Sequence, residues 1–312
     1  MITLSEERMR EALPWRDLVE ALRGMFRTGC EMPVRHHHTV EVPDEPDATL
    51  LLMPAWVPGA YEGVKVANVF PGNADRGQPA ISASYLLSSG RTGELLAILE
   101  GGELTARRTA AASALAADYL ARPEAETLVM AGTGRLSLNL IQAHRSVRPV
   151  RQVRVWGRNP EKAAAIAREA RGLGVEAEAA EDLEEAIRTA DIVSCATLST
   201  QPLIRGDWLP AGCHVDLVGG FRPTMREADD SAIRRSTVFV DTRAGATKEA
   251  GDIVVPMETG VLAAEGIAAD LYDLTRGDHP GRTSAEQITL FKSVGAALED
   301  LAAAILAYES TR

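Results

Sequence analysis

The pattern of hydrophobic and polar positions divides the chain into two parts of different character. In the first part, residues 4–29 carry apolar side chains at spacings of three and four, and this periodicity predicts a helix. The positions that set the spacing are Leu18, Leu22, Met25 and Phe26. Residues 31–100 contain short apolar or alternating segments separated by Pro, Gly, Asn and Asp, which is typical of a meander of β-strands. The expected strands are 34–42, 49–57, 63–70, 81–88 and 94–99.

A long Ala-rich helix is expected after these strands. Thr105 is a suitable N-cap residue, the helix runs to about Leu120, and Arg122-Pro123 ends it. We place the boundary between two domains at this break.

From residue 127 onward, short apolar strands alternate with helices. The expected strands are 127–131, 152–156, 175–179, 191–196, 214–218 and 238–241, and the expected helices between them include 160–171 and 181–189. This alternation predicts a parallel, doubly wound sheet. From about residue 286 the chain is expected to be helical again, and its C-terminal helix is expected to return to the first domain.

The expected fold is therefore α/β, with a doubly wound parallel sheet of the Rossmann type and a smaller, mostly β domain. The expected domain limits are 1–121 together with the C-terminal helix of about 286–312, and 122–285. The length of 312 residues agrees with two domains of roughly 150 residues each.

Charge and composition exclude several classes of protein. The formal net charge of -11 opposes the phosphates of nucleic acids, so nucleic-acid binding is not expected. No apolar run approaches the ~20 residues of a membrane helix. The first residues also lack a basic segment followed by an apolar core, so no signal peptide is expected. Three cysteines without a CxxC pair argue against a disulfide scaffold or a zinc site and favour the cytoplasm.

A dinucleotide-binding loop is predicted where the strand 127–131 ends. Gly132-Thr133-Gly134 lies between this strand and a helix, which is the context that a Rossmann phosphate loop requires. Glycines let the backbone approach a pyrophosphate, and the helix N-terminus supplies N–H donors. Arg135 and Leu136 follow, and Ser137 takes the third small position of the motif. The alternative interpretation is a glycine turn in another α/β fold.

The end of the next strand predicts which dinucleotide is bound. Enzymes that use NAD usually carry Asp or Glu about 20 residues along the chain, which bonds the ribose 2′-hydroxyl. Here Arg158 and Asn159 stand at this strand end, and Arg158 lies 24 positions after Gly134 (158 − 134). A guanidinium binds a 2′-phosphate, so the sequence predicts NADP(H) in preference to NAD(H). The alternative is that Arg158 is a solvated residue at a helix start.

Several segments together resemble the ornithine cyclodeaminase/μ-crystallin family, and they occur in the family's order from about residue 32 to 300. They are Met32-Pro33-Val34-Arg35, Gly63-Val64-Lys65, Thr92-Gly93, LTARRTAA at 104–111, Gly132-Thr133-Gly134, ADIV at 190–193 with Ala196-Thr197, Glu249-x-Gly251-Asp252, FKSVG at 291–295 and ALED at 297–300.

The resemblance implies that the first ~120 residues and the C-terminal helix form a domain that makes a homodimer. It also implies that a small imino or amino acid meets a nicotinamide cofactor in a cleft beside the Rossmann domain. The family's substrate chemistry depends on an Arg, a Lys and a second Arg, which match Arg35, Lys65 and Arg108. The residues expected near the cofactor are Thr197, Val218, Ser293 and Val294. Glu227 and Asp252 also match family positions, and we interpret them as structural.

Two of these residues have a physical interpretation that is independent of the family. Arg108 would lie near the first turn of the helix that Thr105 begins, where its guanidinium could bind a carboxylate. Lys65 lies in the apolar segment VKVANVF, where an uncompensated ammonium is costly. Such a lysine points to a cleft or a partner, and the alternative is a lysine on an edge strand that faces water. Arg107 is expected to face another way.

One departure from the family pattern bears on the reaction. Ornithine cyclodeaminases carry a proton-handling Asp after the fifth Rossmann strand, where this chain has Phe221. The departure puts cyclodeaminase activity in doubt and favours the μ-crystallin branch, whose members reduce cyclic ketimines with NADPH. The leading interpretation is a reductase of Δ1-pyrroline-2-carboxylate or Δ1-piperideine-2-carboxylate. The alternatives are ornithine cyclodeaminase, which makes proline and ammonia with recycled NAD, and a non-enzymatic nucleotide- or ligand-binding protein.

No metal site is expected. His36, His37 and His38 are adjacent in a predicted strand, so their side chains point alternately to opposite faces and cannot converge on one ion.

Overall fold

The computed structural model describes the backbone of residues 1–312 and the side chains of all of them except residues 74 and 75. The chain divides into two compact units. The N-terminal unit contains residues 1–108 and 297–312, and the Rossmann unit contains residues 109–296. The expected limits were 121 and 286. The first boundary falls within helix α3 (Gly101–Leu120), which is continuous, so a sequence break at Pro123 does not locate it.

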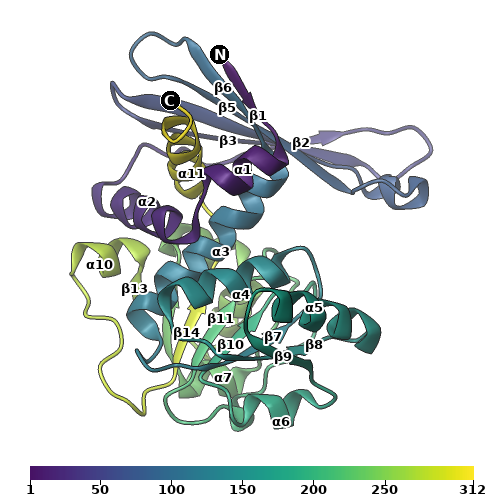
Figure 1. The fold of residues 1–312 in the computed structure, drawn as a ribbon, viewed down its shortest axis with the longest axis vertical. Helices are drawn as coiled ribbons and strands as arrows, with labels where there is room; N and C mark the ends of the chain where they lie inside the picture. Colours follow the sequence, from purple (N-terminus) through teal and green to yellow (C-terminus); the bar gives the residue numbers. More distant parts are fainter. The chain divides into compact units, whose positions relative to one another are not determined.

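The N-terminal unit contains a six-stranded sheet in the order β1-β6-β5-β4-β3-β2 (Figure 1). Its strands are β1 (Ile2–Leu4), β2 (His36–Val40), β3 (Ala48–Val57), β4 (Tyr61–Val69), β5 (Ile81–Ser89) and β6 (Leu95–Glu100), with a 3-10 helix η1 (Pro71–Arg76). Neighbouring strands from β2 to β6 are antiparallel, and β1 pairs in parallel with β6. The predicted meander is therefore confirmed, and β1 adds a strand that the sequence pattern did not indicate.

Two helix predictions for this unit were wrong. The expected helix over 4–29 is two helices, α1 (Glu6–Ala12) and α2 (Trp15–Thr28), because Pro14 precedes α2 in an extended conformation. Helix α3 begins at Gly101 rather than after Thr105, because the carboxylate of Glu100 accepts hydrogen bonds from the amides of Gly102 (2.8 Å) and Glu103 (2.6 Å).

The two faces of the six-stranded sheet differ in burial. Helix α11 (Ala297–Glu309) packs on strands β3, β4 and β5. The buried face carries Met53, Ala55, Lys65, Ala67, Tyr85, Leu87, Ala97 and Leu99. On the opposite face Pro54, Val64, Leu86 and Ile98 are direct cross-strand neighbours and are only half-buried. This face is an apolar row that the described part of this chain leaves partly open to solvent.

The Rossmann unit contains an eight-stranded sheet in the order β13-β12-β14-β11-β10-β7-β8-β9, and all neighbouring strands are parallel. Its strands are β7 (Thr127–Ala131), β8 (Gln152–Trp156), β9 (Glu176–Ala179), β10 (Ile192–Cys195), β11 (His214–Leu217), β12 (Thr237–Val240), β13 (Ile267–Asp270) and β14 (Thr289–Lys292). The strand order reverses between β7 and β10, so the predicted doubly wound α/β fold is confirmed.

The helices of the Rossmann unit follow the strands along the chain (Figure 1). They are α4 (Leu136–Val147), α5 (Pro160–Gly172), α6 (Leu183–Ile187), α7 (Asp230–Arg235), α8 (Arg243–Glu249), α9 (Gly251–Glu258) and α10 (Leu271–Arg276), with 3-10 helices η2 (Gly206–Trp208) and η3 (Ala264–Gly266). One expectation here was wrong. The chain is not helical from 286, because its segment 289–292 forms the buried interior strand β14.

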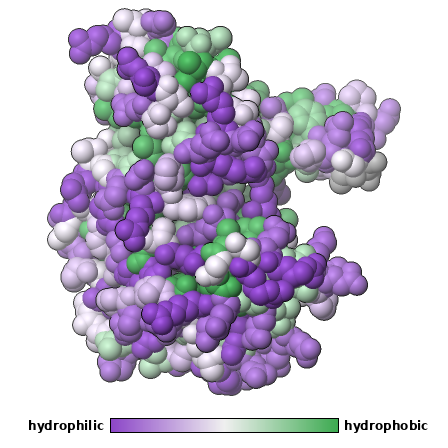
Figure 2. Space-filling model, in the orientation of Figure 1, coloured by the Kyte–Doolittle hydropathy of each residue, from purple (hydrophilic) through white to green (hydrophobic). Residues whose placement is uncertain are grey.

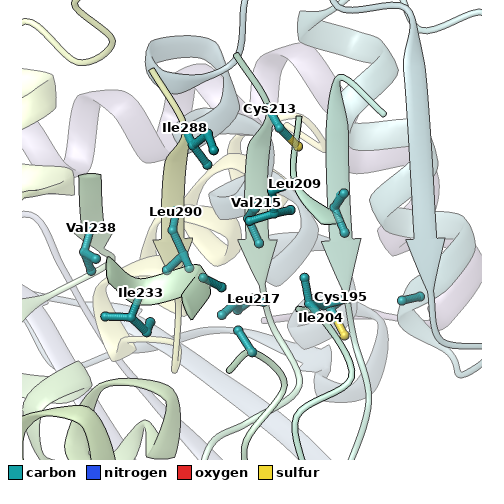
Figure 3. Close-up of a cluster of buried hydrophobic side chains, with 14 of the residues drawn as sticks. Cys195, Ile204, Leu209, Cys213, Val215, Leu217, Ile233, Val238, Ile288 and Leu290 are labelled. Carbon is teal, nitrogen blue, oxygen red and sulfur yellow. The ribbon is translucent and has the colours of Figure 1, made fainter. Parts of the chain in front are cut away.

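The core of this unit forms between neighbouring strands and the segments that cover them. Figure 3 shows apolar side chains of β10, β11 and β14 lying together, among them Cys195, Val215, Leu217 and Leu290. These side chains are fully buried and hold the strands of the sheet against one another.

Hydrophilic residues cover most of the face drawn in Figure 2. None of the helices in the described part of the chain is long and apolar enough to cross a membrane.

Candidate active site

Lys65 lies in the middle of β4, on the buried face of the sheet of the N-terminal unit. The period of two along the strand directs Lys65 to the same face as Ala67, and its cross-strand neighbours are Met53 and Tyr85. Only 4% of the residue is exposed. Its Nζ lies 2.7 Å from Oδ2 of Asp300, which is also buried. Lys65 therefore does not face water, and its charge is paired inside the unit.

Arg108 meets the same carboxylate from helix α3. Its Nε donates to Oδ1 of Asp300 at 2.8 Å, and its Nη1 donates to Oε2 of Glu299 at 2.7 Å. The expectation that Arg108 lies in the first turn of a helix was wrong, because α3 starts seven residues earlier at Gly101 (108 − 101). Its guanidinium is held by two carboxylates of the first turn of α11 instead. We call Lys65, Arg108, Glu299 and Asp300 the ion cluster.

Burial and pairing shift the pKa values of the ion cluster in different directions. Burial lowers the pKa of Lys65 to about 8, although Asp300 acts against this shift, and the positive charges of Arg108 and Arg35 add to it. Burial also disfavours the ionised form of Asp300, but Arg108 and Lys65 outweigh burial and the pKa of Asp300 is lowered. The pKa of Arg108 is raised, because Asp300 and Glu299 outweigh its burial. Lys65 therefore loses its proton at a lower pH than an ordinary lysine.

Two further residues adjoin the ion cluster. Arg35 is half-buried just before β2, and its charge acts on Lys65. Tyr85 is fully buried opposite Lys65, and its hydroxyl has no hydrogen-bond partner among the described residues. The Tyr85 ring lies against Gly63, where any added Cβ would overlap it. Neighbouring Arg107 faces away, as expected: its guanidinium donates to the Leu13 carbonyl.

The sequence analysis grouped Arg35, Lys65 and Arg108, and in the structure the charges of both arginines act on Lys65. It assigned no role to Asp300, Glu299 or Tyr85. A signal for the two acids was present in the sequence. Glu299 and Asp300 begin a helix that is otherwise almost entirely apolar, and a buried carboxylate requires a positive partner. No comparable signal distinguished Tyr85 from other strand residues.

The predicted phosphate loop has the backbone geometry of a dinucleotide site. Gly132 adopts a φ of 131°, and its amide donates to the Trp156 carbonyl at 2.8 Å. A Cβ at Gly132 would lie 2.6 Å from the Ala196 carbonyl oxygen, so only glycine fits. Ser137 is buried and its hydroxyl donates to the Gly132 carbonyl at 3.0 Å. The third small residue thus closes the turn, as the motif requires.

The loop leaves room for a pyrophosphate. A Cβ added to Gly134 would meet nothing within 4 Å. Helix α4 starts at Leu136, and its N-cap residue, Arg135, makes no side-chain capping bond. A helix N-terminus beside open space is suited to an anion. The residues of this loop therefore fit the dinucleotide that the sequence predicts.

The end of β8 lies beside the phosphate loop. A Cβ at Gly157 would be 2.6 Å from Cγ2 of Thr133, so the two turns are in contact. The next residue, Arg158, is exposed. Asn159 is the N-cap of α5, where its side chain accepts from the Lys162 amide at 3.0 Å. Arg158 is therefore available to a ligand, whereas the side chain of Asn159 is already used to cap the helix.

The other residues expected at the cofactor follow three adjacent strands. Thr197 follows β10, Val218 follows β11, and Ser293 and Val294 follow β14. The carboxyl ends of parallel strands meet at one edge of a sheet, so these residues share the edge at which β7 leads into the phosphate loop. Two carboxylates hold these loops: Glu227 accepts from the Thr197 amide at 2.7 Å, and Asp241 accepts from the Val294 amide at 2.7 Å. The sequence analysis identified Glu227 as a structural residue and did not identify Asp241.

Phe221 lies in the loop after β11 and is 39% exposed. The guanidinium of Arg222 lies 5.6 Å from the centre of its ring.

The three histidines of β2 are exposed, and they lie opposite three consecutive residues of the antiparallel strand β3. Within the described residues, no group of three or more His, Cys, Asp or Glu side chains is arranged to hold a metal ion.

Comparison with known proteins relates this chain to a family of enzymes. The sequence profile of the ornithine cyclodeaminase/mu-crystallin family matches residues 2–312. A Delta(1)-pyrroline-2-carboxylate reductase of Paracoccus denitrificans is 39% identical over 93% of this chain and 90% of its own length. The ketimine reductase mu-crystallin of Rattus norvegicus is 33% identical over 79% of this chain and 75% of its own length.

A solved structure agrees with this assignment. The Delta(1)-pyrroline-2-carboxylate reductase of Thermococcus litoralis, in complex with NADH and L-proline, superposes with a TM-score of 0.92 at 33% identity, covering 100% of this chain and 97% of the other. The resemblance seen in the sequence motifs thus extends over the whole chain. The chain belongs to the ornithine cyclodeaminase/mu-crystallin family.

Proposed function

We propose that this protein is a nicotinamide-dependent reductase of cyclic imino acids, with Δ1-pyrroline-2-carboxylate or Δ1-piperideine-2-carboxylate as substrate. The observation that carries the proposal is the buried ion cluster, in which a lysine with a pKa of about 8 lies beside an arginine. A reductase of this kind needs a cation for the substrate carboxylate and a proton for the imine nitrogen. The relatives named above act on such substrates.

The ion cluster supplies both requirements from this chain's own residues. The Nε and Nη1 of Arg108 donate to Asp300 and Glu299, and these two bonds fix the plane of the guanidinium. Neither bond uses Nη2, which is the nitrogen that would donate to the substrate carboxylate. Arg35 adds positive charge next to Lys65. Lys65 holds a proton on Nζ near neutral pH and keeps the imine nitrogen protonated, which makes the C=N carbon a better electrophile. When bound, the reduced nicotinamide supplies the hydride that this carbon accepts.

The structure offers little support for the cyclodeaminase alternative. That reaction needs a proton-transfer group where this chain has Phe221, whose phenyl ring carries no acidic or basic atom. Removal of such a group costs about 10²–10⁴-fold in rate. The described neighbour of the Phe221 ring is Arg222, which is also unsuited to take up a proton.

The test of the proposed function is a comparison of substrates on the purified protein. Oxidation of NADPH and NADH is followed with each of the two imino acids, and ammonia release is followed with ornithine and NAD. We expect rapid reduction of an imino acid and no ammonia from ornithine. Proline and ammonia from ornithine would contradict the proposal. Nicotinamide binding without turnover of any imino acid would favour a non-enzymatic binding protein.

We propose further that NADP(H) is preferred to NAD(H), because the exposed Arg158 is the charged residue at the strand end next to the phosphate loop. An Arg158→Asp variant loses a charge-assisted bond to the 2′-phosphate and gains repulsion. We expect its KM for NADPH to rise about 10–100-fold, whereas the KM for NADH changes little. Arg168→Ser, at another exposed position on α5, is the control. An equal change for both cofactors would contradict the assignment.

The homodimer that the family resemblance implies is also a proposal. We place its interface on the apolar row of the six-stranded sheet, where Pro54, Val64, Leu86 and Ile98 are only half-buried. A Val64→Glu variant would bury an unpaired carboxylate, which costs several kcal/mol. We expect light scattering to show a dimer for the wild type and a monomer for this variant. Leu173→Glu, at an exposed leucine of the Rossmann unit, should leave the dimer intact.

We propose the cytoplasm as the location. The support for this proposal is that the sequence has three cysteines and no CxxC pair, which is typical of a protein of a reducing compartment.

A further inference from the structure

A single buried carboxylate joins two loops at the carboxyl edge of the Rossmann sheet. Glu227 lies in the segment between β11 and α7 and is fully buried. Its Oε1 accepts from the Thr197 amide at 2.7 Å and from the Thr197 hydroxyl at 2.9 Å. Its Oε2 accepts from the amides of Gly219 at 2.7 Å and Gly220 at 3.3 Å. Four donors therefore converge on one side chain, and both oxygens act only as acceptors.

The joined loops adjoin the phosphate loop. A Cβ at Gly132 would lie 2.6 Å from the Ala196 carbonyl oxygen and 3.6 Å from Cγ2 of Thr197. At Gly219, an added Cβ would overlap the backbone of Thr197. The phosphate loop, the β10 loop and the β11 loop are thus in direct backbone contact in that order. A change in the position of Thr197 would be transmitted to the phosphate loop without an intervening side chain.

Glu227 is itself held in place by further buried charged residues. Oδ1 of Asp252 accepts from the amides of Glu227 at 2.8 Å and Ala228 at 2.9 Å. Lys292, fully buried on β14, donates from Nζ to the Leu217 carbonyl at 3.0 Å. Burial raises the pKa values of Glu227 and Asp252, and the positive charge of Lys292 acts against this shift. A fully buried carboxylate, lysine and second carboxylate are expensive to place in a protein core. The hydrogen bonds from the loop amides to Glu227 and Asp252 offset part of this cost, and they are made only when the loops hold these positions.

We propose that Glu227 is a positioning residue that fixes the loops after β10 and β11 in the shape that receives the nicotinamide cofactor. This inference rests on the nicotinamide binding of the proposed function. Glu227 acts through Thr197, Gly219 and Gly220 rather than by contact with the reacting atoms. Sequence reasoning treated Glu227 as structural, and the four donors on its oxygens give it this more specific task.

Because four donors bond to the two oxygens of Glu227, replacement by glutamine tests the proposal. Glu227→Gln is isosteric, but an amide has one acceptor oxygen and an NH2 group that can only donate. The NH2 group must therefore face either Thr197 or the two glycine amides, and one of the loops is released. A carboxylate that only fills space would tolerate this replacement.

The experiment measures the loops in the cofactor-free protein and cofactor binding separately. Hydrogen exchange of the amides of Thr197, Gly219 and Gly220 is compared in wild type and Glu227→Gln, and the dissociation constant of NADPH is measured by its fluorescence. We expect at least about tenfold faster exchange at one of the two loops and about tenfold weaker NADPH binding, since hydrogen bonds to a charged group are lost.

A matched control lies two residues away. Asp229 accepts the amides of Gly206 and Ala232 with the same oxygen, Oδ1, so Asp229→Asn removes a charge but retains both bonds. We expect this variant to match the wild type in both measurements. Should Glu227→Gln fail to fold, Thr197→Val and Thr197→Ser replace it. Valine lacks the hydroxyl that donates to Glu227 and should weaken NADPH binding, whereas serine should restore it.

The outcomes separate the two proposals. Equal exchange in Glu227→Gln and Asp229→Asn, or faster exchange with unchanged NADPH affinity, would overturn the positioning role. If the wild-type protein binds neither NADPH nor NADH, the proposed function fails and the cofactor part of this inference fails with it. The exchange data, obtained without cofactor, would still decide whether Glu227 holds the two loops.

Discussion

Replacement of Lys65 by methionine is expected to lower kcat for imine reduction by about 10²–10⁴-fold, which is the range for loss of a proton-transfer group. Methionine keeps the length and the apolar stem of the side chain but removes the ammonium that pairs with Asp300. Because Arg108 still holds Asp300 and Glu299, the carboxylates do not lose all compensation. Steady-state kinetics with a saturating imino acid and NADPH measures this loss.

The pH dependence of the wild type tests the same role. Lys65 acts in its protonated form, and its pKa is lowered to about 8. The rate should therefore be constant below this pKa and fall about tenfold per pH unit above it. Asp300 opposes the lowering, whereas Arg108 and Arg35 contribute to it. Asp300→Asn should shift the alkaline decline to lower pH, which a purely structural lysine would not do.

The control for Lys65 is Lys162→Met, which removes an exposed lysine of α5. We expect its kcat and pH profile to match those of the wild type. A Lys65→Met variant with an unchanged pH profile and more than a tenth of the wild-type kcat would refute the role of Lys65 as the proton source.

The parts of the fold that were predictable are those in which local pattern and tertiary structure agree. The strands around the phosphate loop have apolar runs that are buried in the sheet, so β7 and β8 were placed to the residue. The prediction failed where one side chain decided the outcome. Pro14 separates α1 from α2, and the Glu100 carboxylate starts α3 before Thr105. A periodicity averaged over many residues does not contain these local events.

The residues of the site also divide into those that the sequence predicts and those that it does not. Gly132, Gly134 and Ser137 were predictable because the backbone conformation of a turn depends on residue types that are close in sequence. Asp300 lies far from Lys65 and Arg108 in the sequence, and Glu227 lies far from Thr197. A pairing between distant residues leaves no spacing in a single sequence. Only the general rule that buried charges are paired indicated that partners existed.

Arg108 is expected to matter for folding as well as for substrate binding. Arg108→Met would leave Asp300 and Glu299 buried without the guanidinium that pairs with both, and Lys65 would still pair with Asp300. Breaking a buried pair in this way costs about 3–5 kcal/mol in the free energy of unfolding. Urea unfolding of the two proteins measures the loss, and the same variant should show a raised KM for the imino acid.

The acid limit of stability should move in a defined direction. The pKa of Asp300 is lowered in the folded protein by Arg108 and Lys65, which outweigh its burial. Its contribution to stability is therefore complete above the pKa of the unfolded state, about 3.9, and is lost as the pH falls toward the folded-state value. Without Arg108 this pKa rises, so acid unfolding of Arg108→Met should begin at higher pH than in the wild type.

The adjacent residue provides the control that separates folding from binding. Arg107 is also buried in α3, but its guanidinium donates to the Leu13 carbonyl and stacks on Trp15 at 4.2 Å. Arg107→Met should lower the free energy of unfolding and leave the KM for the imino acid unchanged. If the two arginine variants raise this KM equally, the effect comes from loss of stability. Arg108 then has no direct contact with the substrate, and the carboxylate must be bound by Arg35 and Lys65.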